Sequence, residues 1–395
     1  MLRTRDSGHE MVVCSNPDCP QQRFPARELW FVCPGARCPG LRKDRPEEHV
    51  RHYPDQYLFR PSKFGYSAPC PHSPHVAFRK VCPYCWTLQP VATGQSSTIA
   101  VIGSSQSGKT CFITSLIHQI ERQLARRAAF QMSLEWDDQD GLEYFRDHKR
   151  EIFSHGKVPG ATRRQARIRS LQITVRFPIS GRLRRWRHGD QGVVSMVFPD
   201  PSGELLENLN DAYYLHVLTR AEAIILMVDP FASQQYRDRW VRDEKLREAS
   251  EGLADGHIAL NAFVNNMRGQ TGDLRKGKVR KDLAVVVTKC DEEGVFDPDA
   301  DEYDLPVQTY PYSEGITDEI SERVEQHMEL DLGFAHIGAL ARESFRNVAF
   351  FAASALGSPP RLVEENGEKV KRIDNAKPRR VEDPFLWILH KWGYF

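Results

Sequence analysis

Residues 103–110, Gly-Ser-Ser-Gln-Ser-Gly-Lys-Thr, have the spacing of a phosphate-binding loop. An apolar run precedes the segment and an amphipathic stretch at 111–124 follows it, so the loop is predicted to connect a strand to a helix. Backbone N–H groups and the positive end of the helix dipole can then surround a phosphate. We expect Lys109 to contact the β- and γ-phosphates of a nucleoside triphosphate, and the Thr110 hydroxyl to ligate Mg²⁺. The predicted phosphate-binding residues are Gly103, Ser104, Ser105, Gln106, Ser107, Gly108, Lys109 and Thr110.

A second candidate segment, Asp-Pro-Ser-Gly at 200–203, follows the apolar run at 193–198. Asp200 stands at the end of a predicted strand, where a carboxylate can hold Mg²⁺ through water. Gly203 lies three residues later, and its backbone N–H is then free to contact the γ-phosphate. The segment is therefore predicted to respond to the presence of that phosphate.

The base is predicted from the segment Thr-Lys-Cys-Asp at 288–291, at the end of another predicted strand. The Asp291 carboxylate can accept hydrogen bonds from both N1–H and the 2-amino group of guanine, while the Lys289 stem lies along the ring. Adenine has no such pair of donors, so the segment indicates guanine. Further on, the backbone at 354–356 can offer N–H groups to the guanine O6. The predicted base-binding residues are Thr288, Lys289, Asp291, Ser354 and Ala355.

In their order along the chain, these four segments resemble those of P-loop GTPases of the translation-factor-related (TRAFAC) class, over about residues 97–357. The segment at 157–162, before the Arg-rich strand-like run, and the C-terminal stretch at 379–389 are similar to those of bacterial double-GTPase-like domains. The resemblance implies an α/β GTPase domain with GTP and GDP as ligands and Mg²⁺ as cofactor. It also implies a place in a bacterial conflict or signalling system.

The resemblance further implies a threonine that closes over Mg²⁺, for which Thr162 is the candidate. Glu204 follows Gly203, where many hydrolytic relatives have a water-orienting glutamine or histidine. A glutamate can act as a base or hold water, but its charge would repel the γ-phosphate. Gln106 is a second candidate for positioning water. Two functions therefore stay open, a GTP-hydrolysing switch and a non-hydrolysing GTP-dependent adaptor.

The first 90 residues are rich in cysteine and are expected to bind Zn²⁺. Short spacings between cysteines, in a chain with no predicted secretory signal, favour metal over disulfides. Two tetrahedral structural sites are expected, one with four cysteines and one with three cysteines and a single histidine. The pairs can group sequentially or as an interleaved cross-brace, and one zinc ribbon with spare cysteines is the lesser alternative. The candidate ligands are Cys14, Cys19, Cys33, Cys38, Cys70, His72, His75, Cys82 and Cys85.

The elements that must position these residues form an α/β pattern of strand-like runs alternating with helical stretches. We expect a Cys/His-rich zinc-binding domain at 1–95 and a P-loop GTPase domain at 96–395. The second domain is expected to have a mostly parallel sheet with one antiparallel edge strand. An extra strand and helix are predicted at 129–155, and a C-terminal helix around 385–389.

Composition restricts the partners and the compartment. The formal net charge is +1, and no apolar run reaches the roughly 18–20 residues of a membrane span. We therefore expect a cytoplasmic protein whose zinc module or switch segments bind a protein partner. The Arg-rich stretch at 182–188 allows nucleic acid or a membrane surface as a less favoured partner. A P-loop ATPase acting on nucleic acid is disfavoured by the guanine-type segment at 288–291.

Overall fold

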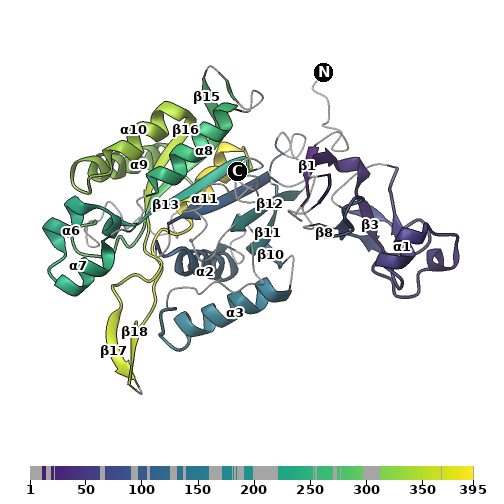
Figure 1. Cartoon of the computed structure of the whole chain (residues 1–395), viewed down its shortest axis with the longest axis horizontal. Helices are drawn as coiled ribbons and strands as arrows, with labels where there is room; N and C mark the ends of the chain where they lie inside the picture. Colours follow the sequence, from purple (N-terminus) through teal and green to yellow (C-terminus); the bar gives the residue numbers. More distant parts are fainter. Residues whose placement is uncertain are drawn as a thin grey trace. The chain divides into compact units, whose positions relative to one another are not determined.

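The structure is a computed structural model (Figure 1), and it divides into two compact units. One unit comprises Met1–Ser97 with Gly192–Ser195, and the other comprises Thr98–Gln191 with Met196–Phe395. The residues that the structure describes are 11–14, 19–21, 23–62, 67–89, 97–104, 107–124, 131–136, 139–159, 171–179, 181, 184, 191–198, 221–251, 253, 256–269, 274–275, 277–296, 312–365 and 367–394.

The smaller unit is built from very short strands around buried cysteines. Its strands form a hairpin β1-β2, a second hairpin β5-β6 and a four-stranded sheet in the order β4-β3-β7-β8. Two of its hydrophobic clusters contain cysteine sulfurs alongside side chains such as Phe24 and Phe31. The elements are β1 (Met11–Val13), β2 (Arg23–Pro25), β3 (Trp30–Val32), α1 (Glu47–His52), β4 (Leu58–Phe59), β5 (Ala68–Pro69), β6 (Val76–Ala77), β7 (Lys80–Val81) and β8 (Leu88–Gln89).

The larger unit is organised by an eight-stranded sheet in the order β10-β11-β12-β9-β13-β15-β14, with β16 also pairing with β15. The pairs β9-β13, β13-β15 and β15-β16 are parallel, as the alternating pattern predicts. The strands are β9 (Ser97–Gly103), β10 (Ser133–Trp136), β11 (Leu171–Pro178), β12 (Gln191–Phe198), β13 (Ala223–Val228), β14 (Leu274–Arg275), β15 (Lys278–Val287) and β16 (Phe345–Ala352).

The margins of this sheet differ from the expected single antiparallel edge strand. β10 pairs antiparallel with β11, and β14 pairs antiparallel with β15, so the described residues include more than one antiparallel edge strand. β10 comes from the segment that the sequence predicts as an extra strand and helix. β14 and β15 are joined by a tight turn at Gly277, whose φ of +77° suits glycine. The α/β, mostly parallel fold is confirmed, with this correction at the margins.

Helices cover both faces of the sheet. Phe350 belongs to a core with side chains of α8, α9 and α10, whereas the neighbouring Phe351 contacts Trp387 of α11 at a centroid distance of 5.9 Å. Since successive side chains of a strand point to opposite faces, these helices lie on opposite sides. The helices are α2 (Lys109–Gln119), α3 (Gln139–Phe153), α6 (Gln234–Trp240), α7 (Glu244–Ser250), α8 (His257–Gly269), α9 (Glu314–Leu330), α10 (Ala335–Ser344) and α11 (Asp383–Lys391).

Strand register brings the predicted binding segments to one edge. Met227 of β13 is paired with Gly103 of β9, and Val228 is paired with Val287 of β15. Val287 is in turn paired with Ala352 of β16. The carboxyl ends of four neighbouring parallel strands are therefore level with one another, which is where open α/β sheets bind ligands.

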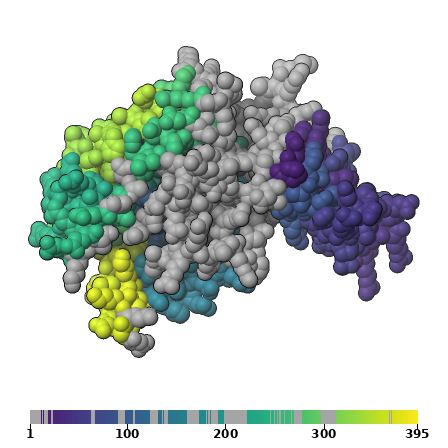
Figure 2. Space-filling view, viewed as in Figure 1, coloured from purple at the N-terminus to yellow at the C-terminus, as the bar shows by residue number. Residues whose placement is uncertain are grey.

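A hairpin follows β16, and the chain at its end is hydrogen-bonded to the segment at 156–158. Its strands are β17 (Arg361–Glu365) and β18 (Glu368–Arg372), and Figure 2 shows it exposed on the surface. The N–H of Val158 donates to the carbonyl of Lys371 at 2.9 Å. β18 thus fixes the segment that precedes the candidate Thr162. In the parts of the chain that the structure describes, no helix has the length and apolar character needed to span a membrane.

Candidate nucleotide site and cysteine clusters

The loop after β9 is closed around its own lysine. The Lys109 ammonium donates hydrogen bonds to the carbonyls of Gly103 and Ser104, both at 2.7 Å, and its side chain is buried. Gly108 precedes α2 with a φ of +82°, and its carbonyl accepts the first helical hydrogen bond, from Phe112, at 2.8 Å. The lysine therefore points into the loop, where a bound phosphate would compete with the carbonyls for it.

Two features of the loop fit a phosphate group. The Ser107 hydroxyl is buried and has no hydrogen-bond partner among the described residues, so a polar ligand would satisfy it. The first turn of α2 also presents backbone N–H groups and the positive end of the helix dipole. Two predicted phosphate-binding residues, Ser105 and Gln106, lie outside the described residues.

Gly103 is required by close packing. A Cβ atom at this position would lie 2.7 Å from Ser107 Oγ and 2.9 Å from Met227 Cβ. The carbonyl oxygen of Met227 would be 3.2 Å away. Any larger residue must therefore push β9 away from β13 or displace the loop.

The predicted base side is held at the neighbouring strand ends. The Thr288 N–H and hydroxyl both donate to the carbonyl of Val228, at 2.9 and 3.2 Å. Lys289 has a left-handed φ of +55°, which turns its side chain back across the end of β13. Its ammonium donates to Asp229 Oδ2 at 2.7 Å and lies 4.8 Å from the centroid of Phe231.

Asp229 and Phe231 are site residues that sequence analysis missed. Asp229 is 1% exposed, and its second oxygen accepts a hydrogen bond from the Phe231 N–H at 3.1 Å. The buried carboxylate therefore fixes both the lysine and the aromatic ring that would face a base. The available signal was an aspartate directly after the apolar run at 223–228, in the same position as the other motif residues.

The Asp291 side chain lies half-exposed beyond Lys289, as a ligand-contacting carboxylate must. Its neighbour Glu292 is also partly buried. Burial, reinforced by the Asp291 carboxylate, raises the pKa of Glu292 to about 7. The Glu292 carboxyl is therefore partly protonated near neutral pH, which limits the negative charge beside Asp291.

The predicted turn at 354–355 is connected to the phosphate side. Ser354 is fully buried, and its hydroxyl accepts a hydrogen bond from the Gly357 N–H at 2.6 Å. The carbonyl of Ala355 accepts a hydrogen bond of 2.7 Å from the hydroxyl of Ser115, which lies on α2. The turn and the helix that follows the phosphate loop are thus joined directly. Four further candidates, Thr162, Asp200, Gly203 and Glu204, lie outside the described residues.

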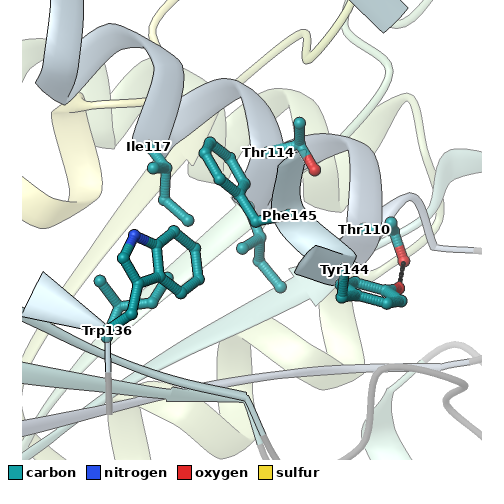
Figure 3. Close-up of a pocket in the computed structure, with 8 residues that line it drawn as sticks. Thr110, Thr114, Ile117, Trp136, Tyr144 and Phe145 are labelled. Atoms are coloured by element: carbon teal, nitrogen blue, oxygen red, sulfur yellow. Dashed lines mark hydrogen bonds between the residues drawn. The ribbon is translucent and has the colours of Figure 1, made fainter. Parts of the chain in front are cut away.

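An apolar pocket adjoins the loop between α2 and α3 (Figure 3). At its rim the hydroxyls of Thr110 and Tyr144 are 3.3 Å apart, within hydrogen-bond distance. The rest of the pocket is apolar, and Trp136 stacks on Phe145 at a centroid distance of 4.9 Å. The lining residues are Thr110, Ile113, Thr114, Ile117, Trp136, Tyr144, Phe145 and Ile173.

The cysteines of the smaller unit form two clusters. In the outer cluster, Cys14 Sγ is 3.4 Å from Cys85 Sγ, and Cys19 Sγ is 3.7 Å from Cys82 Sγ. All four sulfurs lie within 4.8 Å of one another. Zinc–sulfur bonds of about 2.3 Å in a tetrahedron place sulfurs about 3.8 Å apart, so this spacing suits Zn²⁺. It is too long for a disulfide.

The inner cluster contains Cys33, Cys38 and Cys70, with Cys38 Sγ 3.6 Å from Cys70 Sγ. Neither candidate histidine joins this group of three within the described residues. A Cβ built on Gly35 would lie 2.9 Å from His75 Nε2 and 3.7 Å from Cys33 Sγ, so His75 borders the cluster. The His72 ring instead packs on Tyr57, at a centroid distance of 5.2 Å.

The grouping is nested. The first and last cysteine pairs form the outer cluster, and the residues between them form the inner one. This is neither the sequential arrangement nor the cross-brace that the spacing allowed. A hydrogen bond from Cys14, with others from the backbone, lowers the pKa of the Cys82 thiol to about 5. Burial of Cys82 acts in the opposite direction. Burial raises the pKa of Cys19 to about 11.

A glycine-bounded loop with a buried lysine, at the carboxyl edge of a mostly parallel sheet with helices on both faces, defines a GTPase-like α/β domain. Residues 97–355 match the model of the Double-GTPase 2 family, and this match covers more than half of the chain. The chain belongs to this family.

The solved structures that match this chain have low sequence identities and low TM-scores. The Arl6 BBS3 small GTPase from Trypanosoma brucei, with a bound nucleotide analogue, is 12% identical over 75% of this chain and 98% of its own, with a TM-score of 0.29. The GTP-bound GTPase-like domain of S. cerevisiae Ski7 is 11% identical over 75% and 50%, with a TM-score of 0.30. Sup35 complexed with GDP is 14% identical over 66% and 37%, with a TM-score of 0.23. No curated protein is similar enough in sequence to count as a match.

Replacing Gly103 tests the close packing of the phosphate loop. We expect Gly103→Ala to lower the free energy of unfolding by about 1–3 kcal/mol, because the added Cβ overlaps Ser107 and Met227. Urea unfolding measures the change. Gly315→Ala is the matched control, since nothing lies within 4 Å of a Cβ there and alanine favours a helix. Equal stability of the two variants would contradict the close approach.

Proposed function

We propose that this protein is a GTP-binding switch that uses Mg²⁺ and hydrolyses GTP to GDP. The supporting observation is the convergence, at one sheet edge, of the Lys109 loop with the segment that contains Lys289 and Asp291. The phosphate and base halves are separated by one strand, β13. The Ser115–Ala355 hydrogen bond holds them together from the other side.

On the phosphate side, the Lys109 ammonium would leave the carbonyls of Gly103 and Ser104 and bind the β- and γ-phosphates. Thr110, Thr162 and Asp200 would hold Mg²⁺, which neutralises charge on the phosphate oxygens. Gly203 and Thr162 would be drawn to the γ-phosphate and released when it is lost. That response to the nucleotide is what makes the protein a switch.

On the base side, the Asp291 carboxylate would accept the two guanine hydrogen bonds. The stem of Lys289 would lie on the ring, in the orientation that Asp229 and Phe231 already hold. Ala355 would present its backbone N–H to O6, whereas the Ser354 N–H donates to the carbonyl of Arg379 at 3.0 Å and would hold the turn in place. Because Asp229 is buried and paired with the lysine, little ordering would be needed when the base binds.

Replacing Asp291 tests the base. We expect Asp291→Asn to weaken GTP binding by about 10- to 100-fold, because charge-assisted hydrogen bonds are lost, and to favour xanthosine triphosphate instead. Equilibrium titration with both nucleotides measures the change. Asp318→Asn is the control, because Asp318 is exposed on α9, away from the strand ends. Unchanged GTP affinity in Asp291→Asn would rule out the guanine assignment.

Glu204 is the proposed residue for orienting the attacking water, with Gln106 as the second candidate. We expect Glu204→Ala to lower the single-turnover rate of GTP hydrolysis by at least about 100-fold while GTP stays bound. Glu343→Ala, at an exposed position on α10, should hydrolyse GTP at the wild-type rate. An unchanged rate in Glu204→Ala would remove that role. A wild-type chain that binds GTP without hydrolysing it would favour the alternative, a GTP-dependent adaptor.

The cysteine clusters are proposed to hold two structural Zn²⁺ ions, the outer with Cys14, Cys19, Cys82 and Cys85. The inner would combine Cys33, Cys38 and Cys70 with His75. Four protein ligands leave no open position for chemistry, so the metal would stabilise the fold. We propose that this module recruits a protein partner in the cytoplasm, so that nucleotide state controls partner binding.

Zinc content tests the nested grouping with paired substitutions. We expect two zinc ions per wild-type chain. Cys14→Ser with Cys85→Ser should remove one ion, because both residues serve the outer cluster. Cys14→Ser with Cys38→Ser should remove both. Elemental analysis of the full chain gives the counts, with Cys290→Ser in the other unit as control. Sequential or cross-braced sites would instead lose both ions in the first pair.

A further inference from the structure

We propose that Tyr144 is a positioning residue for Thr110, the residue assigned above to Mg²⁺. The inference rests on the proposed function. It assigns a role to the β10-α3 segment, which sequence analysis identified only as an addition to a minimal GTPase domain. Tyr144 would hold the Thr110 hydroxyl so that a lone pair of its oxygen faces the metal site.

The two hydroxyls meet across the helix pair. Thr110 is the second residue of α2, directly after the phosphate-loop lysine, and its Oγ1 is 3.3 Å from the Tyr144 Oη. Figure 3 shows the tyrosine ring alongside the first turn of α2 with its hydroxyl directed at the threonine. Tyr144 is partly buried, so its ring is restrained on α3.

α3 is fixed against α2 at several other points. Phe145 is 4% exposed and lines the pocket together with residues of α2 and β10. Further along, Lys149 forms an ion pair with Glu121, just beyond α2. Phe153 stacks on His118 of α2 at a centroid distance of 3.8 Å. These contacts set the position of Tyr144 relative to Thr110.

The chemistry follows from the hydroxyl group. A threonine hydroxyl has one hydrogen and two lone pairs, and a metal ligand must present a lone pair. When the Thr110 hydrogen is donated to the Tyr144 oxygen, the hydroxyl is held with a lone pair turned away from α3. Groups that orient a metal ligand in this way typically contribute 10- to 100-fold to metal affinity. Removing the tyrosine hydroxyl would therefore abolish this contact while the Thr110 ligand itself stays unchanged.

Tyr144→Phe tests this role, because the ring and its packing are kept and only the hydroxyl is removed. A fluorescent GTP analogue is titrated into the full chain at a series of free Mg²⁺ concentrations. We expect the Mg²⁺ concentration that gives half the maximal affinity to rise about tenfold. Affinity in excess chelator should stay within about twofold of wild type. Tyr84→Phe is the matched control, since its hydroxyl bonds to Glu28 on the surface of the other unit.

A double-mutant comparison separates positioning from general stability. In a Thr110→Ala background, Tyr144→Phe should have no further effect on the Mg²⁺ dependence. An unchanged Mg²⁺ midpoint in the single Tyr144→Phe variant would overturn the proposal. So would a lower midpoint, which would mean that the tyrosine competes with the metal. An equal loss of nucleotide affinity with and without Mg²⁺ would also overturn it. A wild-type chain that binds GTP with no dependence on Mg²⁺ would instead remove the assigned metal site.

Discussion

The register of four parallel strands is the constraint on which the site depends. Val228, Val287 and Ala352 are paired in register at the carboxyl ends of β13, β15 and β16, and Gly103 at the end of β9 is paired with Met227, one residue before Val228. One candidate group follows each of these strand ends. In the order β9, β13, β15 and β16 they are the phosphate loop, Asp229, the segment that contains Lys289, and the turn at 354–355. A shift of one residue would turn the side chains of a strand to the other face and separate these groups. The buried apolar strands hold that register, so the hydrophobic core determines the geometry of the polar site.

Hydrogen bonds between the segments make the two halves of the site one structure. Lys289, which follows β15, donates a hydrogen bond to the carboxylate of Asp229, which follows β13. The Ser115 hydroxyl on α2 donates to the carbonyl of Ala355. The β17-β18 hairpin extends this connection, because the chain after the turn at 354–357 returns to fix the segment at 156–158. The smaller unit depends on a different interaction. Its strands have two or three residues, and its cysteine sulfurs occupy the places that larger apolar side chains fill elsewhere.

Local patterns predicted much of the fold and brought the candidate loop at 103–110 to the end of a strand. The loop at 103–110 connects β9 to α2 as predicted, because the glycines, the lysine and the flanking apolar pattern act over only a few residues. Contacts between distant segments were not predictable in this way. Tyr144 contacts Thr110 although 34 positions separate them in the sequence, and Cys14 contacts Cys85 although 71 positions separate them. His49 stands among charged residues in the sequence, yet it is 3% exposed and packs against Trp30. The nested cysteine grouping likewise depends on how β3 and β7 pair, which spacing alone does not determine.

The central claim is that one edge of the sheet binds a guanine nucleotide. Isothermal titration of the wild-type full chain with GTP and with ATP, each with Mg²⁺, tests it most directly. We expect GTP to bind at least about 100-fold more tightly than ATP, since a site built to accept paired hydrogen bonds rejects a base that lacks them. Equal affinity for the two nucleotides, or no binding of either, would contradict it.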